Sequence, residues 1–196
     1  MVSYIKNVKK IEVLNMISAD KFKGVFVALN TIYDDNDNIN TEEIKKLVKI
    51  YKTKGVKGVY VCGSTGEGFL LSTEERMQVA EAVKEASGDD FTVIVHVGCA
   101  GTKESIKLAK HAEKIGADAV SAVPSVYYRL SPECVEKHWN GIIDSTDLPF
   151  IIYNIPPSNP TSPLKPTGQN FIAYISPYEM PASFRISRMY NCGNTL

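Results

Sequence analysis

Apolar residues in the first three quarters of the chain fall into short continuous runs that alternate with segments of helical period. The runs are rich in Val, Ile and aromatic residues, and they span 23–31, 59–62, 91–97, 119–123 and 150–155. Continuous apolar runs, as opposed to alternating ones, are typical of strands covered on both faces of a parallel sheet. We therefore expect five buried parallel strands.

Helical periodicity fills the intervals between these runs. Ile44, Leu47, Val48 and Tyr51 follow the i, i+3, i+4, i+7 spacing of a helix that starts near residue 41, and Gly55 ends it. Further helices are expected over 73–86, 103–115 and 132–143. Five strands alternating with four helices predict an α/β fold, either a barrel or an open doubly wound sheet.

The pattern stops after Pro156. Seven of the ten prolines lie between 156 and 196, a segment that also holds only four charged side chains, Lys165, Glu179, Arg185 and Arg188. The prolines at 156, 157, 160, 163 and 166 are incompatible with a regular helix or a central strand in this segment. Only 171–175 has the character of a short strand. The shift in composition suggests a different origin for this tail.

Composition narrows the class of protein. Lys+Arg and Asp+Glu both number 22, so the balance does not suggest a nucleic-acid or membrane partner. Four cysteines far apart in the chain, with no C-x-x-C pair, argue against a zinc site and a disulfide scaffold, and favour a cytoplasmic setting. We find no secretory signal and no apolar run of the roughly 18 residues that a membrane span needs.

The candidate chemistry starts in the loop after the second strand. Its sequence is Cys-Gly-Ser-Thr-Gly-Glu-Gly, residues 62–68, and a helix opens just beyond it. Glycines allow close approach of a ligand, while the hydroxyls of Ser64 and Thr65 and free N–H groups suit an anion. The spacing does not fit a P-loop or a dinucleotide fingerprint, so a small carboxylate is favoured over a triphosphate. The loop alone is equally compatible with a tight turn that binds nothing.

Five motifs in order resemble the N-acetylneuraminate lyase and dihydrodipicolinate synthase family. They are Gly-Ser-Thr-Gly-Glu-Gly (63–68), His-Val-Gly-Cys (96–99), Gly-Ala-Asp-Ala-Val-Ser-Ala-Val (116–123), Val-Tyr-Tyr (126–128) and Tyr-Asn-Ile-Pro (153–156). The resemblance covers roughly 22–156, is more similar to the sialic acid lyase branch than to the synthase branch, and implies a pyruvate-dependent class I aldolase on a (β/α)8 barrel. It also implies a small 2-keto acid or sialic acid as substrate, no metal or cofactor, and a homotetramer.

The resemblance assigns roles to four residues. Ser64 and Thr65 match the pair that binds the pyruvate carboxylate, and Tyr153 matches the tyrosine that transfers a proton to and from the C4 hydroxyl. Tyr127 matches a tyrosine contributed across the subunit interface. Tyrosines at strand ends also serve as plain packing residues, and this reading stays open for Tyr153 and Tyr127.

Other polar residues are expected to be structural. We interpret His96 as a hydrogen-bonded residue at a strand end and Glu67 as a brace for the loop. His111 and His138 are interpreted as surface or packing residues of helices.

The Schiff-base lysine that this chemistry requires has no counterpart. In the family it lies on the sixth strand, whereas here only Lys165 follows Tyr153, too early and on no recognisable strand. A complete barrel takes about 250 residues, so we expect about five of its βα units.

Three segments follow from this reading. They are a disordered leader (1–16, with Met1 or Met16 as the start left open), the N-terminal part of a barrel (17–156) and a Pro-rich irregular tail (157–196). A frameshift or premature stop after residue 156 would explain the tail. The first and fifth strands would then be unpaired edges.

Three functions remain open. The chain is a sialic acid lyase by descent, inactive as it stands, or a synthase-type pyruvate aldolase. Alternatively it is a non-catalytic fragment that binds pyruvate weakly or docks onto intact subunits.

Overall fold

The computed structural model describes residues 19–124, 128, 130–153, 172–175, 184–185 and 189–190. After a 3-10 turn, η1 (Ala19–Phe22), strands and helices alternate along the chain as the apolar pattern predicts. The strands are β1 (Val25–Ala28), β2 (Gly58–Val61), β3 (Thr92–His96), β4 (Ala119–Ala122), β5 (Phe150–Tyr153), β6 (Ile172–Ile175), β7 (Phe184–Arg185) and β8 (Met189–Tyr190). The helices are α2 (Thr41–Thr53), α3 (Thr73–Ser87), α4 (Thr102–Lys114) and α5 (Pro132–Ile143).

Local signals in the sequence set the helix starts. Ser72 caps α3 in a capping box, where its hydroxyl accepts from the Glu75 N–H at 3.2 Å and Glu75 accepts from the Ser72 N–H at 2.7 Å. Asn40 caps α2, and Ser131 caps α5 immediately before a proline at the first helical position. These caps satisfy N–H groups that a helix leaves without intrahelical partners.

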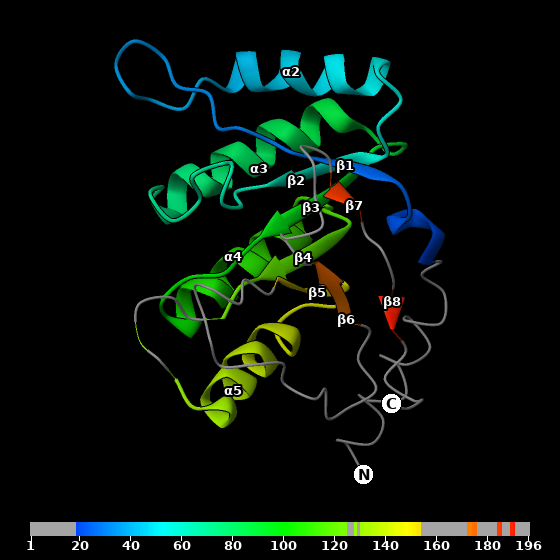
Figure 1. Ribbon diagram of the computed structural model, residues 1–196. Coiled ribbons are helices and arrows are strands. Elements are labelled where there is room, and N and C mark those ends of the chain that lie inside the picture. The colour runs from blue at the N-terminus through cyan, green and yellow to red at the C-terminus, as the bar shows by residue number, and fades with distance from the viewer. Residues whose placement is uncertain are drawn as a thin grey trace.

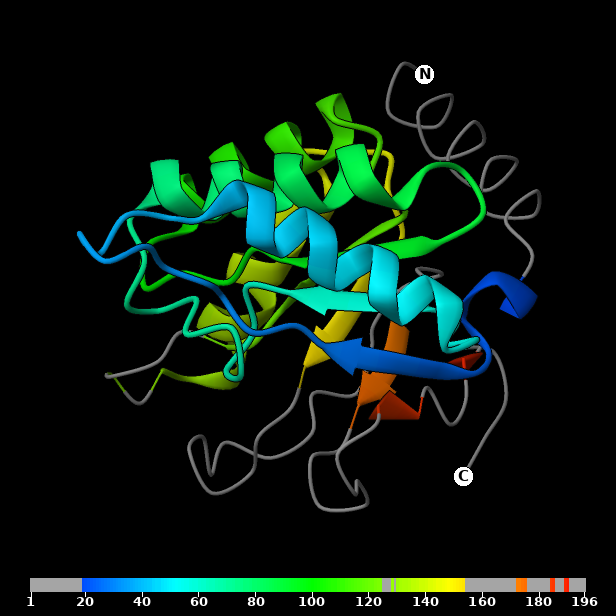
Figure 2. The same cartoon turned by 90° about the horizontal axis from the view of Figure 1, so that it is seen from above.

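The strand order decides between a barrel and a doubly wound sheet. Strands β1 to β6 pair in parallel and lie in the sheet in the order of the sequence. Helices α2, α3, α4 and α5 follow one another along the same side of this sheet, in both views (Figures 1 and 2). A doubly wound sheet would reverse its order and carry helices on both faces. The architecture is therefore the sequential winding of a (β/α) barrel.

The expectation that the first and fifth strands are unpaired edges is wrong. Strand β5 pairs in parallel with β6, and β1 pairs antiparallel with β7. The short strands β7 and β8 occupy the two ends of the eight-stranded order, yet only three residues separate them along the chain. Four peptide steps span at most ~15 Å, whereas a flat eight-stranded sheet is ~34 Å wide. The sheet is consequently strongly curled.

The core between sheet and helices is mainly apolar. Alternate strand residues such as Val59, Val61, Val93 and Val95 join helix residues such as Ile142 in one buried cluster. The strand residues between them belong to the opposite face, which the helices do not cover. The candidate chemistry lies on that second face and at the carboxyl ends of its strands.

Candidate functional site

The loop after β2 has a backbone that depends on its glycines. A Cβ on Gly68 would overlap the carbonyl oxygen of Cys62, and one on Gly66 would lie 2.8 Å from the carbonyl oxygen of Leu29. Cys62 and Glu67 both adopt φ of 56°, in the left-handed region that non-glycine residues rarely occupy. This folded loop leaves the side chains of Ser64 and Thr65 exposed.

The segment after β1 supports the same loop from the side. The hydroxyl of Thr31 donates to the carbonyl oxygen of Gly66 at 2.6 Å, and the phenol of Tyr33 donates to Glu67 Oε2 at 3.3 Å. Burial and then the Glu67 carboxylate raise the pKa of Tyr33, so its phenol stays a donor. Glu67 therefore acts as a brace for the loop, as its position in the sequence predicts.

The structure brings Ser64 and Tyr153 together from positions 89 residues apart in the chain. Ser64 Oγ lies 3.4 Å from Tyr153 Oη, and either hydroxyl can be the donor. Tyr153 ends β5, and its side chain is 6% exposed. Thr65 follows Ser64 in the same exposed stretch of loop. The loop after β2 and the phenol thus lie at one end of the sheet, where the carboxyl ends of parallel strands gather.

Two aromatic rings hold the phenol of Tyr153 in place. The ring of Tyr60 meets it edge to face at 5.8 Å between centroids, and the ring of His96 does so at 6.1 Å. Beneath them, the phenol of Tyr60 donates to Ser121 Oγ at 2.9 Å, with both residues buried. Burial raises the pKa of Tyr60 far above its ordinary value, which keeps this phenol protonated.

His96 does not have the properties of a catalytic base. It is 1% exposed, and burial, followed by the nearby charge of Arg76, lowers its pKa to about 3. The expectation of a hydrogen-bonded structural residue fits these surroundings. Among the other histidines, His111 Nε2 lies 2.7 Å from Glu81 Oε1 at the surface, and His138 packs between α4 and α5.

Two further candidates fall on residues outside the described part of the chain. These are Tyr127, which the family resemblance assigns to a subunit interface, and Lys165, which we did not assign to the Schiff base. Within the described residues, no group of three or more His, Cys, Asp or Glu side chains could hold a metal ion. None of the helices described there is long and apolar enough to span a membrane.

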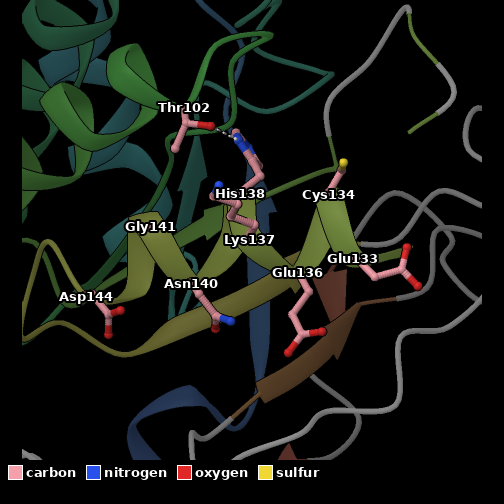
Figure 3. A pocket seen from close by; sticks show the side chains of 9 residues that line it. All are labelled: Thr102, Glu133, Cys134, Glu136, Lys137, His138, Asn140, Gly141 and Asp144. Carbon is pink, nitrogen blue, oxygen red and sulfur yellow. Dashed lines mark hydrogen bonds between the residues drawn. The ribbon is translucent and has the colours of Figure 1, made fainter. Parts of the chain in front are cut away.

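A shallow groove of about 680 Å³ lies elsewhere, along the outer surface of α5 (Figure 3). Thr102, the first residue of α4, is joined to His138 of α5 by a 2.8 Å contact between Oγ1 and Nδ1. Acidic, basic and amide side chains line the rest of the groove, which includes none of the predicted site residues. Mixed charge and a lining drawn mainly from one helix indicate a solvated surface, not a second active site.

Sequence reasoning missed three residues that shape the site. Tyr60 and Ser121 form its floor, and Arg76 reaches from α3 to the backbone after β3. A signal was present for the first two, because each is a polar side chain at the centre of an apolar strand. The charge of Arg76 within the first turns of α3 gave no such signal, since most arginines on helices are exposed.

Comparison with known proteins shows which sequences this chain resembles. Residues 21–168 match the model of the dihydrodipicolinate synthetase family. The chain is 44% identical over 144 residues to an N-acetylneuraminate lyase of Mediterraneibacter gnavus, covering 72% of this chain and 45% of that protein. It is 46% identical over 137 residues to N-acetylneuraminate lyase 2 of Escherichia coli, covering 69% and 45%.

Solved structures of sialic acid aldolases and of a dihydrodipicolinate synthase are similar to this chain as well. A catalytic lysine mutant of the Ruminococcus gnavus sialic acid aldolase superposes with a TM-score of 0.72 at 42% identity, covering 74% of this chain and 48% of that one. The dihydrodipicolinate synthase of Aquifex aeolicus superposes with a TM-score of 0.68 at 30% identity, covering 70% and 47%. The chain spans about half the length of the curated relatives that it matches.

Proposed function

Because the chain belongs to the dihydrodipicolinate synthetase family, we propose that Ser64 and Thr65 bind the carboxylate of a 2-keto acid, with pyruvate as the ligand. The two exposed hydroxyls and the N–H groups of their loop supply donors to an anion. The observation that carries the proposal is the 3.4 Å distance between Ser64 Oγ and Tyr153 Oη. A keto acid held by the loop would lie beside the phenol that is suited to move its proton.

In the chemistry we propose for the family site, Tyr153 exchanges a proton with a hydroxyl of the substrate. In the cleavage direction, with the keto carbon joined to a lysine amine as a Schiff base, the deprotonated Tyr153 phenol accepts the proton of the C4 hydroxyl while the C3–C4 bond breaks, leaving an aldehyde and a three-carbon enamine on that amine. In the condensation direction the phenol returns that proton to the new alkoxide. Contact with Ser64 would give the phenol a hydroxyl partner in both steps. Tyr127 is proposed to join this relay from a second subunit.

The substrate we propose for the whole enzyme is N-acetylneuraminate, cleaved to N-acetylmannosamine and pyruvate. The lyases named above are 44% and 46% identical, whereas the synthase is 30% identical. This difference supports the lyase branch over a synthase-type aldolase. By the same resemblance we propose a cytoplasmic homotetramer.

For the 196-residue chain itself we propose binding without turnover. The aldolase reaction needs a lysine amine to form a Schiff base with the keto carbon, and one solved relative, the Ruminococcus gnavus sialic acid aldolase, is described as a mutant of its catalytic lysine. Here Lys165 is the only lysine after Tyr153. The chain therefore has the groups proposed to bind the carboxylate and to transfer the proton. It has no residue assigned to form the Schiff base that would accept the electrons of the broken bond.

Two measurements on the purified chain test the proposal. Saturation-transfer NMR should detect binding at the pyruvate methyl group, and the S64A/T65V variant should weaken it at least ~10-fold, since each hydrogen bond to a charged group contributes roughly 1.5–3 kcal/mol. The T53V variant is a matched control, because Thr53 is an exposed threonine at the far end of α2. Borohydride treatment with pyruvate should leave no covalent adduct.

Each of the two measurements has an outcome that would contradict the proposal. Equal pyruvate affinity of the wild type and S64A/T65V would show that Ser64 and Thr65 do not bind the carboxylate. A borohydride-trapped adduct would show that the chain supplies a Schiff-base lysine after all.

A further inference from the structure

His96 joins the ends of three neighbouring strands. It is the last residue of β3, and its ring is buried between the ends of β2 and β4. Its Nδ1 lies 3.0 Å from the carbonyl oxygen of Cys62, just after β2, and its Nε2 lies 3.3 Å from the N–H of Val123, just after β4. Both ring nitrogens are therefore used by backbone groups.

These backbone partners determine the tautomer of the ring. A backbone N–H can only donate, so Nε2 must present its lone pair to Val123. A backbone carbonyl can only accept, so Nδ1 must carry the proton that it donates to Cys62. His96 is neutral with its hydrogen on Nδ1, and a second proton on Nε2 would point at the N–H of Val123.

Arg76 reinforces the neutral state of the ring from α3. One guanidinium nitrogen donates to the His96 carbonyl oxygen at 2.6 Å, and the other donates to the Gly98 carbonyl oxygen at 3.0 Å. The first of these nitrogens also lies 3.3 Å from His96 Nδ1. Arg76 is 4% exposed and makes no ion pair with a carboxylate among the described residues. Its positive charge therefore opposes protonation of the imidazole.

Only the hydrogen bond to the Cys62 carbonyl favours a charged ring, and burial and the charge of Arg76 outweigh it. The titratable or charged groups that face His96 from β2, α3, the loop after β3 and β5 are Tyr60, Cys62, Arg76, Cys99 and Tyr153. Burial raises the pKa of the Cys62 thiol to about 11, so this thiol stays neutral. The same burial, with Arg76, places the pKa of His96 at about 3.

The contacts of His96 lead directly to the candidate site. Cys62 is two residues before Ser64, and its left-handed φ of 56° sets the direction in which the loop leaves β2. The imidazole also meets the ring of Tyr153 edge to face at 6.1 Å. Gly98 is required beside it, because a Cβ there would lie 2.9 Å from His96 Nε2.

We propose that His96 is a positioning residue of the keto-acid site: its Nδ1–H holds the Cys62 carbonyl, and thereby the Ser64 and Thr65 hydroxyls, at a fixed distance from the Tyr153 phenol. This role rests on the function proposed above. It assigns no proton transfer to His96, because neither ring nitrogen is free to reach a ligand.

Isotope-edited NMR of the ring tests the tautomer without any ligand. Long-range ¹⁵N–¹H correlation should show Nδ1 as protonated and Nε2 as unprotonated, with both shifts constant from pH 8 to pH 5. A ring that titrates near pH 6.5, or one protonated on Nε2, would overturn the proposal.

Two substitutions separate positioning from general stability. Asn places its amide N–H near the former Nδ1 and can still donate to Cys62, whereas Gln reaches toward the former Nε2 and loses that donor. We expect H96N to keep pyruvate affinity within about threefold of wild type and H96Q to weaken it by about 10-fold, as for a lost hydrogen bond that orients a site. Thermal unfolding measured in parallel should show similar destabilisation of both variants.

The outcomes distinguish this inference from the function on which it rests. If the wild type binds pyruvate and both variants lose affinity equally, or H96Q retains it, then the positioning role is wrong while the proposed function stands. If the wild type itself does not bind pyruvate, the proposed function fails, and the NMR tautomer still decides whether His96 is a fixed neutral bridge.

Discussion

The two faces of the sheet are both buried, but they differ in chemistry. On β5, Phe150 and Ile152 belong to the apolar cluster under the helices, whereas Tyr153 lies on the other face and contacts Ser64. On β2, Val59 and Val61 belong to the same cluster. The residue between them, Tyr60, instead donates to Ser121 on β4, another residue outside the cluster.

The two faces differ because alternate residues of each strand have different roles. Side chains of a strand point to opposite faces with a period of two. The helix-facing set contributes hydrophobic burial, while the inner set, besides apolar residues such as Ile94 and Ile151, carries hydroxyls, an imidazole and phenols in defined hydrogen bonds. Stability therefore depends mainly on one set of alternating strand positions and site geometry on the other, so substitutions can test the two separately.

The largest effect is expected from a helix-facing residue. Phe150→Ala should lower the free energy of unfolding by roughly 3–5 kcal/mol, because it leaves a cavity beside Trp139, whose ring centroid lies 6.4 Å from that of Phe150. Urea denaturation measures this loss. A loss under 1 kcal/mol would show that the helix-covered face is not the main source of stability.

An intermediate effect is expected from pH acting on the inner face. In the unfolded chain His96 takes up a proton near its ordinary pKa of 6.5, whereas in the fold its pKa is about 3. The stability that depends on neutral His96 is therefore complete above pH 6.5 and falls as the pH drops toward 3, by ~1.4 kcal/mol per pH unit.

Urea unfolding at pH 7 and pH 5 should accordingly show a larger loss for the wild type than for H96N, by about 2 kcal/mol. Burial also lowers the pKa of His138, which acts in the same direction in both proteins and so cancels in the comparison. Equal losses in the two proteins would contradict a neutral, buried His96.

A smaller effect is expected from the buried hydroxyl pair. Tyr60→Phe and Ser121→Ala should each cost about 1–2 kcal/mol, because each leaves a buried hydroxyl without this partner. The double variant should cost less than the sum of the two by about 1 kcal/mol. Additive losses in a double-mutant cycle would mean that the 2.9 Å contact contributes nothing to the inner face.

The smallest effect on stability is expected at the site itself. Tyr153→Phe keeps the ring and its edge contacts with Tyr60 and His96, so the free energy of unfolding should change by less than about 1 kcal/mol. Placed beside Phe150→Ala on the same strand, this variant gives the sharpest contrast between the faces. A loss as large as that of Phe150→Ala would mean that Tyr153 is mainly a packing residue.

The sequence predicted the helix-facing half of the molecule well. Helix spacings such as Ile44 to Tyr51 and the apolar runs are local signals, and the structure places helices and strands where they predict them. The site was predictable only in part. The chemistry of the loop pointed to Ser64 and Thr65, and motif resemblance added Tyr153. The structure brings Ser64 and Tyr153 within 3.4 Å of each other.

The remainder depended on contacts between residues distant in the sequence. The link from Tyr60 to Ser121 and the tautomer of His96 follow from the register of β2, β3 and β4, which no local pattern reveals. Treating strands as continuous apolar runs also hid the polar alternation within them. The pairing of β1 with β7 could not be foreseen from a two-residue strand in a tail without periodicity.

Backbone amide mapping tests the central claim most directly. In ¹⁵N–¹H spectra of the 196-residue chain, added pyruvate should shift the amides of Ser64, Thr65 and Tyr153, and it should leave those of Thr102 and His138 in the α5 groove unchanged. Shifts confined to that groove, or no shifts at all, would contradict a keto-acid site on the inner face of the sheet.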